Sequence, residues 1–164
     1  LCGSLQKKYK SEVPVWVAVE LMDWGMLSYL YRMAPKGVRE DIAGICMLSA
    51  AQMESWIKCL NILRNLAAHH SRVFNRGFSI KPKLGKDGRL DIIRDVTNRA
   101  FGQLTLVRYL SHELALSDRG RLPRVLASFP DNDLVPFSRL AAPPGWERHY
   151  LWVPTSAEAD ALSS

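Results

Sequence analysis

The stretch 49–76, SAAQMESWIKCLNILRNLAAHHSRVFNR, decides the fold that this sequence predicts. Ser49 and Gln52 match a capping box, in which a serine oxygen and a glutamine side chain satisfy exposed backbone N–H groups at a helix start. Apolar residues then recur every three or four positions, which is the spacing of an amphipathic helix. We therefore expect a helix from Ser49 to about Ser71, with a dense polar cluster at its carboxyl end.

Helical patterns also flank this stretch. The segment from Val15 to about Met33 is apolar nearly all round, which is typical of a helix at the centre of a bundle. After residue 76, Gly and Pro residues punctuate a basic segment in which two short apolar runs predict a small hairpin. The remaining predicted elements are a short helix at 38–48, the hairpin runs at 78–80 and 90–93, a helix at 96–116, and a helix at 122–129 capped by Ser117 and Asp118.

These patterns predict an all-α fold, a bundle of about five helices with a basic loop or small hairpin after the long helix. We expect a lead-in segment at 1–12, one helical domain at 13–154 and a disordered tail at 155–164. The aromatic residues Trp146, Tyr150 and Trp152 are expected to fold back on the bundle.

The length and composition exclude several classes of protein. A chain of 164 residues makes one ordinary domain, and it has no uncharged apolar run of the roughly 18 residues that a membrane span needs. The three cysteines, Cys2, Cys46 and Cys59, show no CxxC spacing, so neither a zinc site nor a disulfide framework is expected. A reducing cytoplasm suits such a protein best.

The positive charge is concentrated in one part of the chain. Residues 64–108 contain ten Lys or Arg and three Asp or Glu, a net charge of +7, whereas the remaining residues sum to −1. A basic patch of this kind favours a polyanionic partner such as RNA, although a solvated basic surface has the same composition.

A helical wheel separates the polar cluster into two faces. With Arg64 at 0° and an advance of about 100° per residue, Asn61, Asn65, His69 and Arg72 fall at about 60–140°, on one polar side. Glu54 and Lys58 fall on the same side. His70 falls at about 240°, on the apolar face, where a histidine is more often a packed, hydrogen-bonded structural residue than a catalytic one.

The polar face has groups that suit phosphodiester cleavage. Arg64 has forked donors that bind phosphate oxygens and offset transition-state charge, and His69 has a side chain suited to general base or acid catalysis. Asn65 is one helical turn from His69 and is expected to orient it. The alternative is a structural helix end, in which Arg64 pairs with Glu54 or Glu20 and the histidine interacts favourably with the helix terminus.

The spacing Arg64-Asn65-x-x-Ala68-His69-His70-x-Arg72-x-x-Asn75-Arg76 closely resembles the signature of the Abi-like (abortive infection) proteins of the HEPN superfamily. Segments 14–28 and 144–152 resemble the family's preceding helix and its C-terminal element. Two positions depart from the pattern, because Ala67 stands where Cys is common and Phe74 where Trp is common. Both are packing changes that leave the polar residues intact.

The resemblance implies a HEPN-like bundle and a metal-independent endoribonuclease without a cofactor, which leaves a 2′,3′-cyclic phosphate. It also implies a bacterial cytoplasmic toxin or antiphage protein, a homodimer that joins two motifs, and an antitoxin or other defence protein as a further partner. The expected catalytic residues are Arg64, Asn65 and His69, with His70 as an additional candidate. The residues expected to bind RNA phosphates are Arg72, Arg76, Lys81 and Lys83. The alternative function is a non-catalytic helical module that binds RNA, a nucleotide or another protein.

Overall fold

The computed structural model describes residues 14–153; the expected lead-in 1–12 and tail 155–164 lie outside the described residues. Within 14–153 the chain forms six α-helices, three short 3-10 helices and no β-strand, so the predicted all-α class is confirmed. The helices are α2 (Val15–Leu21), α3 (Trp24–Met33), α4 (Lys36–Ile45), α5 (Ala50–Ala68), α6 (Ala100–Glu113) and α7 (Arg121–Ala127), with η1 (Asp91–Ile93), η2 (Phe137–Leu140) and η3 (Trp146–Arg148).

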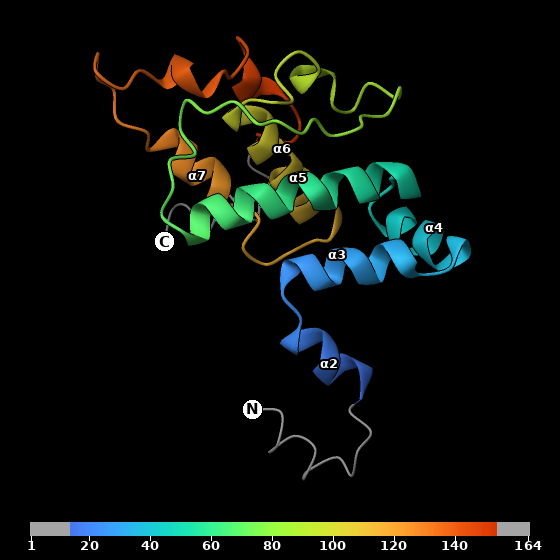
Figure 1. Cartoon of the computed structure of the whole chain (residues 1–164). Coiled ribbons are helices and arrows are strands. Elements are labelled where there is room, and N and C mark those ends of the chain that lie inside the picture. Colours follow the sequence, from blue (N-terminus) through green and yellow to red (C-terminus); the bar gives the residue numbers. More distant parts are fainter. Residues whose placement is uncertain (1–13, 154–164) are drawn as a thin grey trace.

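Helix α5 is the centre of the bundle and contacts α3, α4 and α6 (Figure 1). Its predicted capping box is confirmed, because the Ser49 hydroxyl accepts from the Gln52 N–H at 3.3 Å and the Gln52 side chain accepts from the Ser49 N–H at 2.9 Å. Trp56 and Cys59 on its inner face are almost completely buried. The apolar spacing of α5 therefore serves the core, as the sequence indicates.

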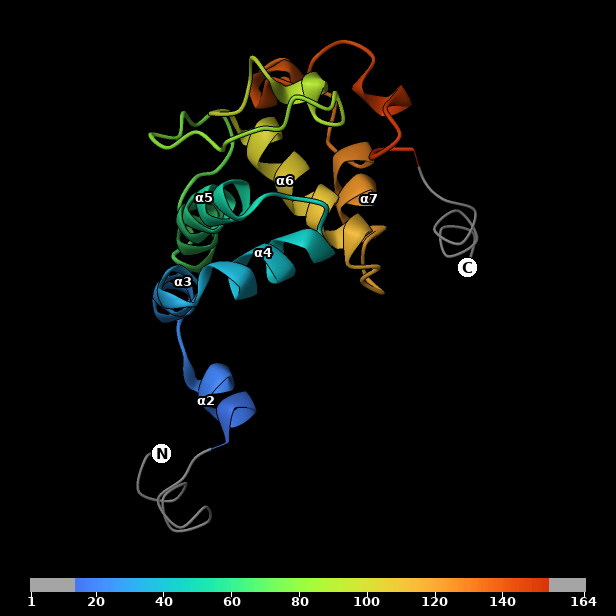
Figure 2. The same cartoon turned by 90° about the vertical axis from the view of Figure 1, so that its right-hand side faces the viewer.

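The prediction of one buried helix from Val15 to Met33 is wrong. The chain is extended at Met22 and Asp23, where the Asp23 carboxylate accepts a hydrogen bond from the Met26 N–H at 2.7 Å and starts α3 as its N-cap. No residue of α2 is buried, and Trp16 is 70% exposed. Figures 1 and 2 show α2 standing apart from the other helices.

The predicted hairpin is also wrong, because residues 77–99 contain a single bridge, between Gly77 and Arg99, and no strand. This segment is held instead by side chains: Arg89 binds the Asp87 carboxylate, the Met47 carbonyl at 2.8 Å and the Tyr109 hydroxyl. Such contacts between distant residues leave no periodic signal in the sequence.

The last two helices are shorter than predicted. Helix α6 starts at Ala100, after a turn at 94–98. Helix α7 has Gly120 at its N-cap without a side-chain cap, so the predicted cap by Ser117 and Asp118 is wrong. Trp152 is buried and stacks on Phe101 with ring centroids 5.2 Å apart, and Trp146 lies edge-on to both rings. These two tryptophans fold back on the bundle as predicted, whereas Tyr150 is 46% exposed.

Candidate functional site

The polar cluster lies where α5 ends, three residues earlier than the sequence predicts. The Ser71 N–H donates to the Leu66 carbonyl at 2.8 Å and the His70 N–H donates to the Ala67 carbonyl at 3.2 Å. These two bonds form a Schellman motif, with His69 as C-cap and His70 in the left-handed conformation at φ 52°. Because a glycine usually occupies this left-handed position, the sequence contains no stop signal there.

This ending changes the environment of both histidines. The wheel placed His70 on the packed face, but it is exposed, so that prediction is wrong. His69 is exposed as well, and its ring makes no hydrogen bond to any residue of 14–153. Its backbone N–H still donates to the Asn65 carbonyl at 3.0 Å, which ties His69 to the last turn of α5.

Arg64 and Asn65 form a hydrogen-bonded pair on the surface of α5, in which the Arg64 guanidinium donates to the Asn65 side-chain oxygen at 3.0 Å. The Asn65 amide therefore positions Arg64 and not, as predicted, the His69 ring. Among the described residues Arg64 has no ion pair, so the alternative pairing with Glu54 or Glu20 is wrong.

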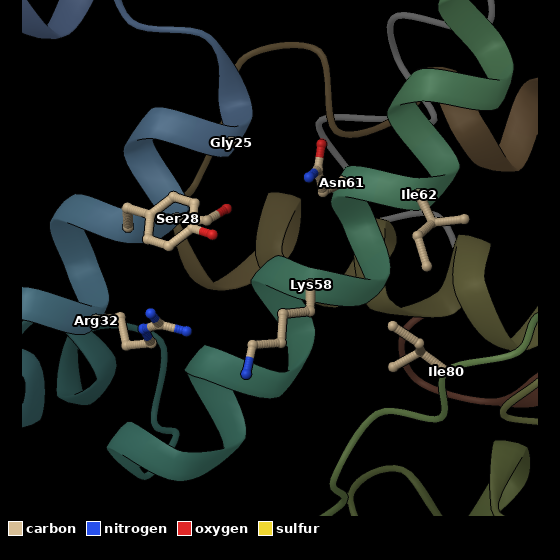
Figure 3. A pocket seen from close by; sticks show the side chains of 8 residues that line it. Gly25, Ser28, Arg32, Lys58, Asn61, Ile62 and Ile80 are labelled. Atoms are coloured by element: carbon tan, nitrogen blue, oxygen red, sulfur yellow. The ribbon is translucent and has the colours of Figure 1, made fainter.

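Two adjoining cavities lie between α3 and α5. The smaller, of about 170 Å³, is lined by Arg64 and Asn65 together with Asp23, and the larger, of about 260 Å³, contains Arg32 and Lys58 (Figure 3). Gly25 and Asn61 line both, so the two form one continuous depression, which we call the α3–α5 groove. Its lining residues are Asp23, Trp24, Gly25, Ser28, Tyr29, Arg32, Lys58, Asn61, Ile62, Arg64, Asn65 and Ile80.

The walls of the groove are held by specific contacts. The Trp24 indole N–H donates to the Ile57 carbonyl of α5 at 3.1 Å, and the Ser28 hydroxyl donates to the Trp24 carbonyl at 2.7 Å. The wheel correctly placed Lys58 and Asn61 on the face of Arg64. The sequence reasoning missed the opposite wall, although Gly25, Ser28 and Arg32 follow one another at three- and four-residue spacing, which marks one helix face.

The basic segment contributes fewer free charges than its composition indicates. Arg89 and Arg94 form ion pairs with nearby aspartates, and Arg99 donates a hydrogen bond to the Asn75 side chain at 3.2 Å. Arg108 is fully buried, and its guanidinium donates to the Leu151 and Arg119 carbonyls. The six remaining basic residues of 64–108 are exposed and form no ion pair within 14–153: Arg64, Arg72, Arg76, Lys81, Lys83 and Lys86.

Lys81 and Lys83 lie beside α5 because the backbone around them is fixed to that helix. The Lys83 N–H donates to the Ser55 hydroxyl at 2.9 Å, and the Lys83 carbonyl accepts from the Trp56 indole at 2.9 Å. Ile80, just before them, lines the α3–α5 groove. The structure thus brings Lys81 and Lys83 near one edge of this groove.

The end of the motif has a structural role. Asn75 adopts the left-handed conformation at φ 50°, and Phe74 stacks on Phe129 with ring centroids 5.6 Å apart. Both features fix the turn that follows α5.

Cys46 and Cys59 are buried free thiols, and burial raises the pKa of Cys59 to about 11. In the described part of the chain no group of three or more His, Cys, Asp or Glu is arranged to hold a metal ion.

A comparison with protein-family models identifies the part of the chain that contains this site. Residues 3–75 match the family described as Abi-like protein. The matched segment includes both walls of the α3–α5 groove except Ile80, together with Arg64, Asn65, His69 and His70. No curated protein and no solved structure matches the chain.

Among residues 14–153, no helix is long and apolar enough to cross a membrane.

Proposed function

We propose that this chain is an endoribonuclease subunit of a bacterial abortive-infection system, with RNA as its substrate. The observation that carries this proposal is the position of Arg64. Its guanidinium lines a groove, is held by Asn65, and has no carboxylate partner among the described residues, so it is free to bind a phosphate. The name of the matched family, which refers to abortive infection, supports the biological context.

The proposed reaction is a transesterification within RNA. The ribose 2′-oxygen bonds to the adjacent phosphorus while its proton passes to a neutral His69 imidazole, and the bond from phosphorus to the 5′-oxygen breaks. The leaving 5′-oxygen takes up a proton, which leaves a 2′,3′-cyclic phosphate and a 5′-hydroxyl. Arg64 offsets the negative charge that develops on the phosphate oxygens, and Asn65 holds the guanidinium in place.

The proposed active form is a homodimer, in which His69 of the partner subunit protonates the leaving oxygen. Two features support this assembly. The site of one copy is shallow and exposed, and the neighbouring surface carries large apolar side chains on α2 and α3, including Trp16, Leu21 and Met26. Exposed apolar surface of this kind marks an interface with another protein.

The test is an RNA cleavage assay in the presence of a chelator. We expect wild-type protein to cleave, Arg64→Ala to lose a factor of about 10²–10³ in rate, and His69→Ala a factor of about 10²–10⁴. Arg124→Ala removes an exposed arginine of α7 and serves as the matched control with unchanged cleavage. Absence of cleavage in all four proteins, with RNA binding intact, would overturn the nuclease proposal. Loss of wild-type cleavage with the chelator would overturn the metal-independent mechanism.

A non-catalytic RNA- or nucleotide-binding module is the second candidate function. It is favoured by the His69 ring, which no described side chain orients, whereas a catalytic imidazole is usually held by a hydrogen bond. For such a module, RNA binding depends on Arg64 and the cleavage assay yields no products.

A further inference from the structure

Two cations, Arg32 and Lys58, line the larger cavity of the α3–α5 groove, and no carboxylate is among its lining residues. Lys58 binds the Glu54 carboxylate at 2.9 Å and Arg39 approaches it at 3.9 Å. The hydrogen bond from Lys58, together with the charges of Lys58, Arg39 and Arg32, holds the pKa of Glu54 below its usual range. One carboxylate thus faces three cations, and two of these, Arg32 and Lys58, line the cavity from opposite helices (Figure 3).

An aromatic ring stands beside this charge. The Tyr29 ring is on the α3 wall and its side chain is 60% exposed, while the Arg32 guanidinium lies 4.9 Å from the ring centroid. This cation–π contact fixes the arginine next to the ring. A positive groove lined by an aromatic side chain is the usual combination for single-stranded nucleic acid, because the charges follow the backbone and a base stacks on the ring.

The rest of the cavity suits a nucleotide as well. Ile62 and Ile80 form an apolar patch on the side of the cavity away from Gly25 and Ser28 (Figure 3). The Asn61 amide makes no hydrogen bond to any described residue, so its donors and acceptor are available to a ligand. Asn61 also lines the smaller cavity, which connects this site to Arg64.

We propose that the α3–α5 groove is a binding site for a single RNA strand, in which Arg32 and Lys58 hold one phosphate and Tyr29 stacks a base. Lys58 and Arg64 are six residues apart on α5, about 9 Å along its axis, so they contact different phosphates of the strand. The site guides the strand toward Arg64, and in this respect it rests on the proposed ribonuclease function.

The test measures binding of a fluorescent single-stranded oligonucleotide with 2′-deoxy sugars, which has no 2′-hydroxyl to react. Fluorescence anisotropy gives the Kd for wild type, Tyr29→Ala, Tyr29→Phe and Arg32→Ala, with Arg124→Ala as the control for an exposed arginine. We expect Tyr29→Ala to weaken binding roughly tenfold and Tyr29→Phe to bind as wild type, since the ring face is what stacks. Arg124→Ala binds as wild type.

A salt titration separates a phosphate contact from a loss of structure. For Arg32→Ala the slope of log Kd against log salt concentration falls by about 0.7, the value for one phosphate contact on a single strand. A folding defect would instead lower the fraction of active protein without this change in slope. Wild-type slope and affinity in both Arg32→Ala and Tyr29→Ala would overturn the proposed site.

The same variants distinguish failure of this site from failure of the nuclease proposal. If Arg64→Ala abolishes RNA cleavage while Arg32→Ala and Tyr29→Ala bind and cleave as wild type, the nuclease stands and the strand-binding site is wrong. If no protein cleaves RNA but binding depends on Tyr29 and Arg32, the strand-binding site stands and the nuclease proposal is wrong.

Discussion

The guanidinium of Arg64 donates a hydrogen bond to the side-chain oxygen of Asn65, 3.0 Å away on the adjacent residue of α5. Neighbouring residues on a helix point in directions about 100° apart, so the bond requires both side chains to bend toward the same side. The pair lines the smaller cavity of the α3–α5 groove. Asn65 therefore determines where the Arg64 charge is presented.

The first prediction concerns this pair. Asn65→Ala releases the Arg64 side chain and is expected to lower RNA cleavage about tenfold, less than Arg64→Ala, because the charge is retained but no longer held. Asn65→Asp is expected to be worse, since a carboxylate beside Arg64 neutralises it and repels phosphate. Single-turnover cleavage measures both. Equal activity of Asn65→Asp and wild type would contradict the role of Arg64 as a phosphate ligand.

The second prediction separates the two histidines. His70 has φ 52° at the end of α5, a conformation that costs a non-glycine residue roughly 1 kcal/mol, so His70→Gly is expected to stabilise the fold by about that amount. Urea unfolding measures the change. Cleavage is expected to stay at the wild-type level, whereas His69→Gly loses it. A stable His70→Gly protein that no longer cleaves RNA would reverse the assignment of the two residues.

The third prediction compares two glycines. A Cβ atom at Gly102 would lie 2.2 Å from the Val96 carbonyl oxygen, so Gly102→Ala is expected to destabilise the protein by several kcal/mol through steric overlap at the start of α6. At Gly44, in α4, a Cβ atom meets no atom within 4 Å, and Gly44→Ala is expected to stabilise by roughly 0.5–1 kcal/mol. Thermal unfolding of both variants tests whether the two changes in stability have opposite signs.

The fourth prediction addresses the exposed helix α2. Trp16→Glu places a charge where a 70% exposed indole now lies, and it is expected to convert a dimer to a monomer and to reduce cleavage in parallel. Leu134→Glu changes a 94% exposed residue in the loop before η2 and serves as the control that leaves the dimer intact. Light scattering gives the mass. A wild-type monomer that still cleaves RNA would contradict the composite site.

The fifth prediction is a loss of stability at alkaline pH. Burial raises the pKa of Tyr109 to about 12, above its ordinary value of 10.0, so the folded state disfavours the phenolate. The stability contributed by Tyr109 is fully present below pH 10.0 and is lost as the pH rises toward about 12. Tyr109→Phe is expected to show a shallower alkaline decline in the free energy of unfolding.

Tyr109→Phe is also expected to cost about 1–3 kcal/mol at neutral pH, because the hydroxyl donates to the Cys46 carbonyl at 3.0 Å and accepts from Arg89. Urea titrations between neutral and alkaline pH measure both effects. If stability declines at alkaline pH as steeply in Tyr109→Phe as in wild type, the decline belongs to other groups. Tyr31 is one such group, because burial raises its pKa as well.

Local chemistry in the sequence predicted those elements that neighbouring residues specify. The capping box at Ser49 and Gln52 is one, and the apolar spacing that buries Trp56 in α5 is another. The break at Met22 and Asp23 was missed because apolar periodicity continues across it. The predicted hairpin failed because the segment that contains Arg89 is fixed by distant partners, and no period-2 pattern records them.

The sequence by itself determined the all-α class, the central helix and the polar face that carries Lys58, Asn61 and Arg64, since all three follow from short-range spacing on one helix. The tertiary structure decided which residues form the opposite wall of the groove, because α3 and α5 are joined by side-chain contacts such as the Trp24 bond to the Ile57 carbonyl. It also decided the exposure of His70. Helix α5 ends just before His70, which has a left-handed backbone conformation. Backbone hydrogen bonds stabilise this conformation, and the type of side chain does not.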